Sequence, residues 1–544
     1  MHIDFLGGAT TVTGSQFLLT TSRAKVLIDC GMFQGSPNES VRNRIPFAFE
    51  PAELDAVVLT HAHLDHCGLL PLLVKGGYRG AIHATAGTVE LATLVLLDSG
   101  HLHEEFAKRE ARWEKRNPDK VEADDRKEAD IYQAAIDLAA AGGEHVPTTV
   151  EPVEPVEPVE SIPPIEPTAP ASWPRDPEAD LRAQPPSVDI DLDLPLYTVK
   201  DAERTLEHFR AIDYGEEREV APGVWATFLD AGHILGSAII RLRVQDTEGG
   251  EERIVVCSGD LGRPGTPILR DPTAMTAADY VLVESTYGGR EHEPQDEAIR
   301  ILAETIRMVD AAKGVLLVPS FAIGRTQEVV WELDRLIARG EIPLLPLYLD
   351  SPMASKASDI YRRHPEHYDE ETAELLRTGE TPLDYPNQII TNDYKASQAI
   401  ERAPRPYMIV ASNGMLTGGR VVGHLRRLID DPTATILFVG YQGEGTLGSH
   451  LQAGAKEVKL DGQPRRVRCQ VRSISGFSAH ADETELLDWL KGFGAGRRPG
   501  DAGYPRRIFL VHGDPEAQVA LEPRVQALGF ATHVPHWHER VILD

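Results

Sequence analysis

A run of metal-ligand residues at positions 60–68 constrains the fold of this chain more than any other stretch. It follows an apolar segment, 54–59, that is typical of a buried β-strand with β-branched residues. Three histidines and one aspartate then fall within six positions, and both side-chain types are zinc ligands. A polar surface loop is the alternative, but it does not explain why four ligand-type residues follow a buried strand. The sequence therefore predicts a strand whose end delivers metal ligands into a loop and the start of a helix.

The spacing within this run divides the ligands between two ions. His61 and His63 are two residues apart, so in extended backbone their side chains point the same way and can hold one metal. Asp65 and His66 follow the turn and point elsewhere, toward a second ion. Two ions about 3.5–4 Å apart can clamp the oxygens of a phosphoryl or carbonyl group.

Other apolar strands also end in ligand-type residues. One such strand end is commonplace, but several indicate a site at one edge of a sheet. We expect His233 and Asp260 to complete the metal cluster, with Asp260 able to bridge both ions. Asp29 closes an earlier strand, where it can orient a ligating histidine or simply form a turn. The later strands are 225–230, 253–257, 280–284 and 507–511, which lead to His233, Asp260, Glu284 and His512.

A second α/β unit is predicted from alternating apolar strands and helices between about 314 and 440. Its loops carry Gly, Ser, Asn and Arg, which can offer backbone N–H groups and guanidinium to phosphates. Arg325, Ser412 and Asn413 are the candidate binding residues, and ordinary structural turns are the alternative. A later loop, 474–482, holds Ser478 and His480 just before a predicted helix.

The net charge of −29 argues against nucleic-acid binding when taken alone, because such proteins usually show a basic footprint. About ten of these charges come from residues 144–193, which hold twelve acidic and two basic side chains. This stretch includes a Glu-Pro-Val repeat, whose prolines prevent helix and sheet and favour an extended chain. We read 105–195 as an insertion that is first helical and then a disordered acidic tether.

The compartment predicted from the sequence is the cytoplasm. The four cysteines are scattered and form no Cys-x-x-Cys pair, which is typical of a reducing compartment. The N-terminus lacks the basic and apolar regions of a signal peptide. No apolar run approaches the roughly 20 residues that span a bilayer, so we expect no membrane association.

Taken together, these residues resemble a known family. The pattern of Asp29, the 61–66 run, His233 and Asp260 is similar to the metallo-β-lactamase signature. Glu284, His480 and His512 resemble the three additional motifs of its β-CASP branch, a group of nucleic-acid-processing nucleases. That branch includes the endonuclease of the eukaryotic pre-mRNA 3′-end cleavage complex, and the similarity is greatest to compact bacterial RNA-cleaving members. It covers nearly the whole chain except roughly 105–195.

The resemblance implies an α/β fold: a metallo-β-lactamase αββα sandwich with an inserted β-CASP α/β domain. Residues 1–104 and 196–290 would form the first part of the lactamase domain, interrupted by the 105–195 insertion. Residues 291–463 would form the β-CASP domain, and 464–544 the C-terminal part of the lactamase domain.

The resemblance also implies a function and two Zn²⁺ per chain. The chain would be a zinc-dependent ribonuclease that hydrolyses single-stranded RNA with water activated between the two metals. Glu284 and His480 would assist the leaving group, Asp29 would support the metal ligands, and Asp65 would be both ligand and catalytic residue. Ser478, Arg325, Ser412 and Asn413 would bind substrate. One zinc would be held by His61, His63 and His233, and the other by Asp65, His66 and His512, with Asp260 bridging.

Two other functions remain open at this stage. One is hydrolysis of a thioester or lactam on the same metal core, which would not need Glu284, His480 or the inserted unit. The other is an RNA-binding scaffold without catalysis, which would have little use for a complete ligand set. A homodimer is also open. The acidic insertion could be an inert spacer, a competitor for RNA in a basic groove, or a tether for a basic protein partner.

Overall fold

The computed structural model describes residues 1–35, 37–140, 194–440, 442–443, 445–460 and 462–544. The acidic tether that we expected within 144–193 lies outside the described residues. Among the described helices, none combines the length and apolar character that crossing a membrane would require.

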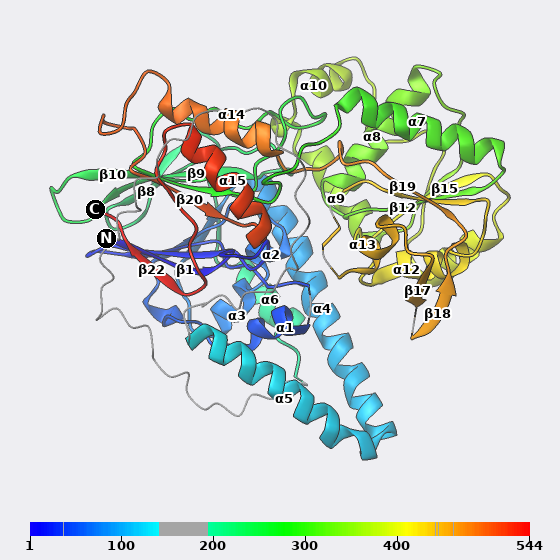
Figure 1. The fold of residues 1–544 in the computed structure, drawn as a ribbon, viewed down its shortest axis with the longest axis horizontal. Helices are drawn as coiled ribbons and strands as arrows, with labels where there is room; N and C mark the ends of the chain where they lie inside the picture. Colours follow the sequence, from blue (N-terminus) through cyan, green and yellow to red (C-terminus); the bar gives the residue numbers. More distant parts are fainter. Residues whose placement is uncertain (36, 141–193, 441, 444, 461) are drawn as a thin grey trace, which may run out of the picture.

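Two facing sheets form the larger part of the molecule (Figure 1). Their apolar faces meet in a core that includes Phe5, Phe228 and Phe509. The first sheet runs in the order β22 (Glu539–Ile542), β1 (His2–Gly7), β2 (Gln16–Thr20), β3 (Lys25–Ile28), β4 (Ala56–Val58), β5 (Ala81–Ala84) and β6 (Phe209–Ala211). The second runs β21 (Thr532–His533), β20 (Arg507–Val511), β11 (Tyr280–Glu284), β10 (Glu252–Cys257), β9 (Ala238–Gln245), β8 (Val224–Asp230) and β7 (Glu217–Ala221).

Helices cover the outer face of each sheet, because strands that are apolar on both faces need a second layer. The first sheet packs against α3 (Leu70–Lys75), α4 (Ala86–Arg116) and α6 (Val199–Leu206). The second packs against α14 (Glu483–Gly494) and α15 (Pro515–Ala527). The result is the αββα sandwich that the sequence predicted.

A third sheet forms the inserted domain, and all of its strand pairs are parallel. Helices α7 (Gln295–Ala311) and α8 (Arg325–Ala338) pack on one face, and α12 (Gly419–Leu428) and α13 (Leu447–Gln452) on the other. The order is β14 (Gln388–Ile390), β13 (Leu347–Leu349), β15 (Tyr407–Ala411), β12 (Val315–Pro319), β16 (Ala434–Phe438) and β19 (Gln470–Ser473). The predicted mixed α/β fold with an inserted domain is confirmed.

The domain boundary expected at residue 463 divides this third sheet. Strand β19 pairs in parallel with β16, so the inserted domain continues at least to Ser473. No side chain of β19 is fully buried, since it lies at the sheet edge. It therefore lacks the apolar run that made the other strands recognisable in the sequence.

Helix α4 passes through the boundary expected at residue 105 without a break. The part of α4 that packs on the sandwich and the predicted helical start of the insertion are thus one element. After Asn117 the chain turns back as α5 (Pro118–Ala140), which packs against α1 (Pro37–Ser40) and η1 (Val41–Arg44). Figure 1 shows this helical pair projecting from the sandwich.

Candidate metal centre

The predicted ligands gather at one edge of the sandwich. Strands β3, β4 and β5 are parallel, as are β10, β11 and β20, so their carboxyl ends share an edge within each sheet. Strand β4 leads into the histidine run and α2 (Leu64–Cys67), and β3 leads to Asp29. Strands β8, β10 and β20 lead to the other ligands, which are His233, Asp260 and His512.

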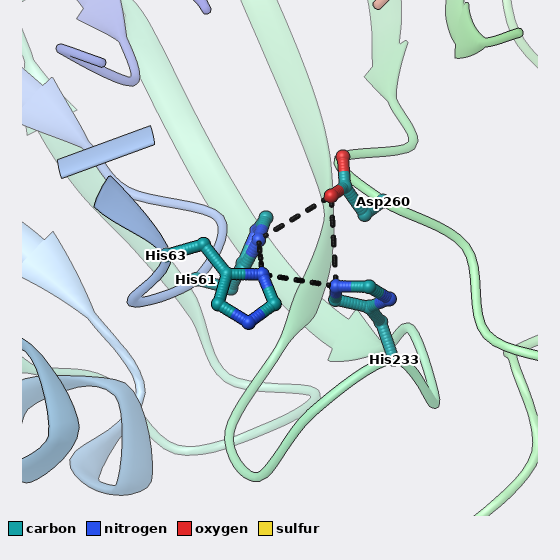
Figure 2. Close-up of side chains that lie close together, drawn as sticks. All are labelled: His61, His63, His233 and Asp260. Atoms are coloured by element: carbon teal, nitrogen blue, oxygen red, sulfur yellow. Dashed lines mark hydrogen bonds and ion pairs between the residues drawn. The ribbon is translucent and has the colours of Figure 1, made fainter. Parts of the chain in front are cut away.

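One group of ligand atoms comes from His61, His63, His233 and Asp260, which can each place one atom within 4.8 Å of the others. Figure 2 shows these four side chains converging. His63 Nδ1 lies 3.1 Å from His61 Nε2 and 3.2 Å from His233 Nε2. Asp260 Oδ2 lies 3.5 Å from Nε2 of both His61 and His233.

A second group is formed by Asp65, His66 and His512. His66 Nε2 and His512 Nε2 are 3.2 Å apart, and Asp65 Oδ2 is 3.7 Å from His512 Nε2. The other oxygen of Asp260, Oδ1, lies 3.2 Å from His66 Nε2. Asp260 thus turns one carboxylate oxygen to each group, which is the arrangement of a bridging ligand.

The protonation state of the histidines in the first group favours binding of a cation. Burial lowers the pKa of His61 and His233 well below the ordinary value, and lowers that of His63 to about 4. These rings are therefore neutral near pH 7 and offer lone pairs to one point. No described residue donates a hydrogen bond to Asp260 Oδ1, although that atom is buried. Lone pairs around an unsatisfied carboxylate are the chemistry of a metal site.

Asp260 and His66 show where positive charge is favoured. Burial would raise the pKa of Asp260, but His512, His66 and His61 hold it well below its usual range. Burial would lower the pKa of His66, but Asp260 and Asp29 raise it well above the ordinary value. The same carboxylates that stabilise a proton on His66 stabilise a metal cation in its place.

Asp29 has the contacts expected of a supporting residue. Its Oδ2 lies 2.8 Å from His66 Nδ1, which directs Nε2 of that ring toward the second ligand group. Thr60 donates to the same carboxylate through its backbone N–H and its hydroxyl, each at 2.8 Å. Asp29 therefore fixes the ring of His66 and the loop that starts the histidine run.

Glu284 and His480 form the pair that the sequence predicted. Both oxygens of the fully buried Glu284 lie 3.1 Å from His480 Nδ1, and the backbone N–H of Leu261 donates to Oε1 at 2.6 Å. Burial opposes protonation of His480, but Glu284 and then Asp260 raise its pKa to about 9. His480 Nδ1 is also 4.0 Å from Asp260 Oδ2. A protonated imidazole thus borders the candidate bridging ligand.

The four candidate substrate-binding residues lie in different parts of the molecule. Ser478 is next to the centre, where its Oγ accepts a hydrogen bond from the backbone of His480 at 3.3 Å. Arg325 begins α8, is buried and pairs with Glu328. Ser412 and Asn413 follow β15, where they contact Ser351 and Met415. These contacts place Ser478 at the centre and hold the other three within the inserted domain.

Several supporting residues were missed in the sequence. Ser237 Oγ accepts from the backbone N–H of His233 at 3.0 Å, and Thr286 Oγ1 lies 3.2 Å from His512 Nδ1. His292 Nε2 lies 3.1 Å from the carbonyl oxygen of His480. Ser237 and Thr286 stand four and two residues from a ligand or catalytic position, which is the only signal that could have marked them. His292 lies in a polar loop that carries no such signal.

The sandwich and its edge site define a metallohydrolase of the metallo-β-lactamase class. The Metallo-beta-lactamase superfamily model matches residues 9–131, and the Beta-Casp domain model matches 326–451. A third model, Zn-dependent metallo-hydrolase RNA specificity domain, matches 464–535. These matches fall on both halves of the sandwich and on the inserted domain.

Relatives match along almost the whole chain. Ribonuclease TTHA0252 of Thermus thermophilus is 33% identical over 521 residues, which cover 96% of this chain and 95% of that protein. The transcription termination factor FttA of Methanosarcina mazei is 30% identical, covering 96% of this chain and 69% of that one. The FttA of Pyrococcus horikoshii is 28% identical, covering 98% and 70%. The chain belongs to the β-CASP family of metallo-β-lactamase-fold proteins, and the predicted family is confirmed.

Proposed function

We propose that this chain is a zinc-dependent ribonuclease that hydrolyses phosphodiester bonds of single-stranded RNA. The observation that carries the proposal is the position of Asp260, whose carboxylate borders both ligand groups and also the Glu284–His480 pair. A candidate dinuclear centre and a candidate general acid are thus within reach of one scissile bond.

The ligand sets fit two zinc ions, because imidazole and carboxylate are the side chains that zinc prefers outside thiolate sites. His61, His63 and His233 would hold one ion, and Asp65, His66 and His512 the other, with Asp260 shared. Bound zinc supplies positive charge that stabilises the transition state of phosphodiester hydrolysis and acidifies water.

The chain's own residues would complete the reaction. When the attacking oxygen of water bonds to phosphorus, the bond from phosphorus to the leaving ribose oxygen breaks and that oxygen needs a proton. His480, held by Glu284 at Nδ1, would donate the proton from Nε2. Ser478 lies beside His480, so its hydroxyl would contact the scissile phosphate. Asp29 would keep His66 aligned throughout.

RNA is the substrate class that the comparisons favour. The chain matches an RNA specificity domain, and a relative aligned over nearly its full length is named a ribonuclease. The acidic net charge does not oppose this, because a single-strand channel needs a local basic groove rather than a basic protein. A thioester or lactam hydrolase would leave the Glu284–His480 pair and the inserted domain unexplained. A scaffold without catalysis would leave the ligand sets unexplained.

A circular, internally labelled single-stranded RNA tests the proposal. A circle has no ends, so its conversion to a linear product requires endonuclease action. We expect cleavage by the zinc-loaded protein and none by Asp65→Ala prepared in parallel. Equal cleavage by both proteins would point to a contaminating nuclease. Cleavage of linear but not circular RNA would restrict the activity to chain ends.

We also infer a cytoplasmic location, which is supported by four cysteines that are all buried and unpaired in disulfides. The homodimer and a protein partner on the acidic insertion stay predictions from the sequence.

A further inference from the structure

A second histidine cluster lies away from the metal centre, where the inserted domain meets the sandwich. Helix α9 (Pro352–Arg363) ends beside His364, and a short 3-10 helix, η3 (Pro365–His367), follows at once. His364, Glu366 and His367 can each place one ligand atom within 4.8 Å of the others. We call these three residues the junction cluster.

The ligand atoms of the junction cluster converge on one carboxylate oxygen. Glu366 Oε1 lies 2.7 Å from His364 Nδ1 and 3.8 Å from His367 Nε2. Two imidazoles and one carboxylate are a common set of three protein ligands for zinc, with water in the fourth position. A cation among these atoms would replace the proton that His364 and Glu366 otherwise share.

His367 supplies independent support, because its ring is buried without a hydrogen bond among the described residues. The residue is 5% exposed, and neither ring nitrogen has a hydrogen-bond partner among the described residues. A buried polar atom left unsatisfied costs about 1–3 kcal/mol. A metal ion on Nε2 would satisfy it.

The second ring nitrogen of His364 faces a carboxylate, as is common for histidines that bind metals. Its Nε2 lies 3.1 Å from Oε1 of Glu90, a residue of α4. Ligating histidines commonly donate their other N–H to a carboxylate, which fixes the tautomer and the ring orientation. Glu90 would therefore leave Nδ1 of His364 free to ligate toward Glu366.

Backbone contacts show that the cluster joins two domains. Helix α9 packs against α4, and the N–H of Arg270 donates to the carbonyl oxygen of His367 at 3.3 Å. The N–H of Asp369 donates to the carbonyl oxygen of Ile268 at 2.9 Å. A side chain at Gly87 of α4 would place its Cβ 3.1 Å from His367 Nε2, so the two domains approach closely here.

We propose that His364, Glu366 and His367 bind a zinc-type divalent cation, with Glu90 of the sandwich orienting His364. The cation would fasten the inserted domain to α4 at a site separate from the metal centre. The competing explanation is a metal-free network in which Glu366, His364 and Glu90 simply share protons. This proposal does not depend on the proposed ribonuclease function, because it concerns a different set of residues.

Zinc content separates the two explanations. The full-length protein is purified without chelator, passed over a desalting column and analysed for zinc by mass spectrometry. We expect His367→Ala and Glu366→Ala to carry one zinc per chain less than the unchanged protein. His101→Ala is the matched control, since His101 is an exposed histidine of α4, and should lose none.

Two further features keep the test decisive. If His367→Ala fails to fold, Glu366→Ala decides alone, because the Glu366 side chain is 57% exposed and its removal leaves the core intact. Zinc titration into chelator-stripped protein should then show one equivalent fewer for Glu366→Ala than for His101→Ala. Equal zinc content and equal titrations in Glu366→Ala, His101→Ala and the unchanged protein would overturn the proposal in favour of the metal-free network.

Discussion

Two aspartates, one in each domain, follow buried strands and are themselves buried, yet their surroundings are opposite. Asp350 follows β13 and is surrounded by donors. Asp260 follows β10 and is surrounded by imidazole nitrogens, and no described residue donates a hydrogen bond to its Oδ1. The donors around Asp350 are Thr391 Oγ1 at 2.5 Å, Ser397 Oγ at 2.5 Å, His424 Nε2 at 2.6 Å and Arg420 Nη1 at 2.7 Å.

The contrast shows how a structural carboxylate differs from a candidate metal ligand that has the same position in the sequence pattern. A buried charge is tolerated when donors or counter-charges satisfy it. Around Asp350 the protein itself supplies them, so that residue can act as a structural hub. Around Asp260 the neighbours are imidazole nitrogens: His61 and His233 are neutral, and the proton that Asp260 and Asp29 favour on His66 lies where a metal cation would bind.

Among the substitutions that test this comparison, we expect the largest effect from Asp260→Ala, which should lose RNA cleavage activity. A shared ligand serves both ions, and metal ions supply several kcal/mol of transition-state stabilisation. Because each 1.36 kcal/mol is a factor of ten, RNA cleavage should fall by about 10⁴-fold or more. Single-turnover cleavage of a labelled RNA measures this. Near-normal cleavage would remove Asp260 from the site.

Next in size is His480→Ala, which should slow cleavage by about 10²–10⁴-fold, the usual worth of a positioned general acid. The variant should keep its zinc, because His480 is paired with Glu284 instead of belonging to either proposed ligand set. His512→Ala is the comparison, and it should lose zinc. Loss of zinc from His480→Ala would show that His480 is a ligand.

Asp350→Ala should destabilise the inserted domain by about 3–5 kcal/mol, the cost of removing one partner of a buried ion pair. Burial would raise the pKa of Asp350, but hydrogen bonds from His424, Ser397, Thr391 and Arg420 hold it well below the usual range. A lowered folded-state pKa gives stability that is present above the unfolded value of about 3.9 and is lost as the pH falls below it.

Denaturant unfolding in excess chelator at pH 7 and at lower pH measures both effects. The stability deficit of Asp350→Ala should be full at pH 7 and shrink below about pH 4, where the unchanged protein begins to lose the same contribution. A deficit that stays constant down to pH 3 would mean that the charge of Asp350 is not what stabilises the domain.

The smallest effect concerns the acidic insertion. Replacing 144–193 by a Gly/Ser linker of equal length removes its charge but keeps its length, and a Glu-Pro-Val repeat has too little apolar surface to form a core. We expect zinc content and the melting temperature to be unchanged, as for a spacer. RNA affinity at two salt concentrations is the measurement. Tighter binding by the replaced protein at low salt alone would reveal electrostatic competition instead.

The comparison of the two aspartates also shows how far the sequence could lead. The convergence of the candidate ligands was predictable because four of them fall within six positions and others follow long apolar strands. Asp350 has the same strand-end position, but its donors come from later helices and loops, between Thr391 and His424. A sequence pattern marks where a strand ends and does not reveal which side chains fold back onto it.

Two elements that cross the expected domain boundaries were hard to recognise for a related reason. Strand β19 was not predicted, because an edge strand that is only partly buried has no apolar run. The change from apolar to charged composition near residue 105 marks where α4 leaves the core, while the helix itself continues to Arg116. The junction cluster was missed as well, because the carboxylate that contacts His364 comes from Glu90, which is 274 positions away in the sequence.

The most direct test of the account is the zinc content of the matched pair Asp260→Ala and Asp350→Ala, purified without chelator and measured per folded chain. Any zinc in the junction cluster is common to both proteins and cancels in the comparison. We predict that Asp260→Ala loses zinc, and that Asp350→Ala keeps all its zinc but melts at a lower temperature than the unchanged protein in excess chelator. Equal zinc contents in the two variants would contradict the assignment of Asp260 as the shared metal ligand.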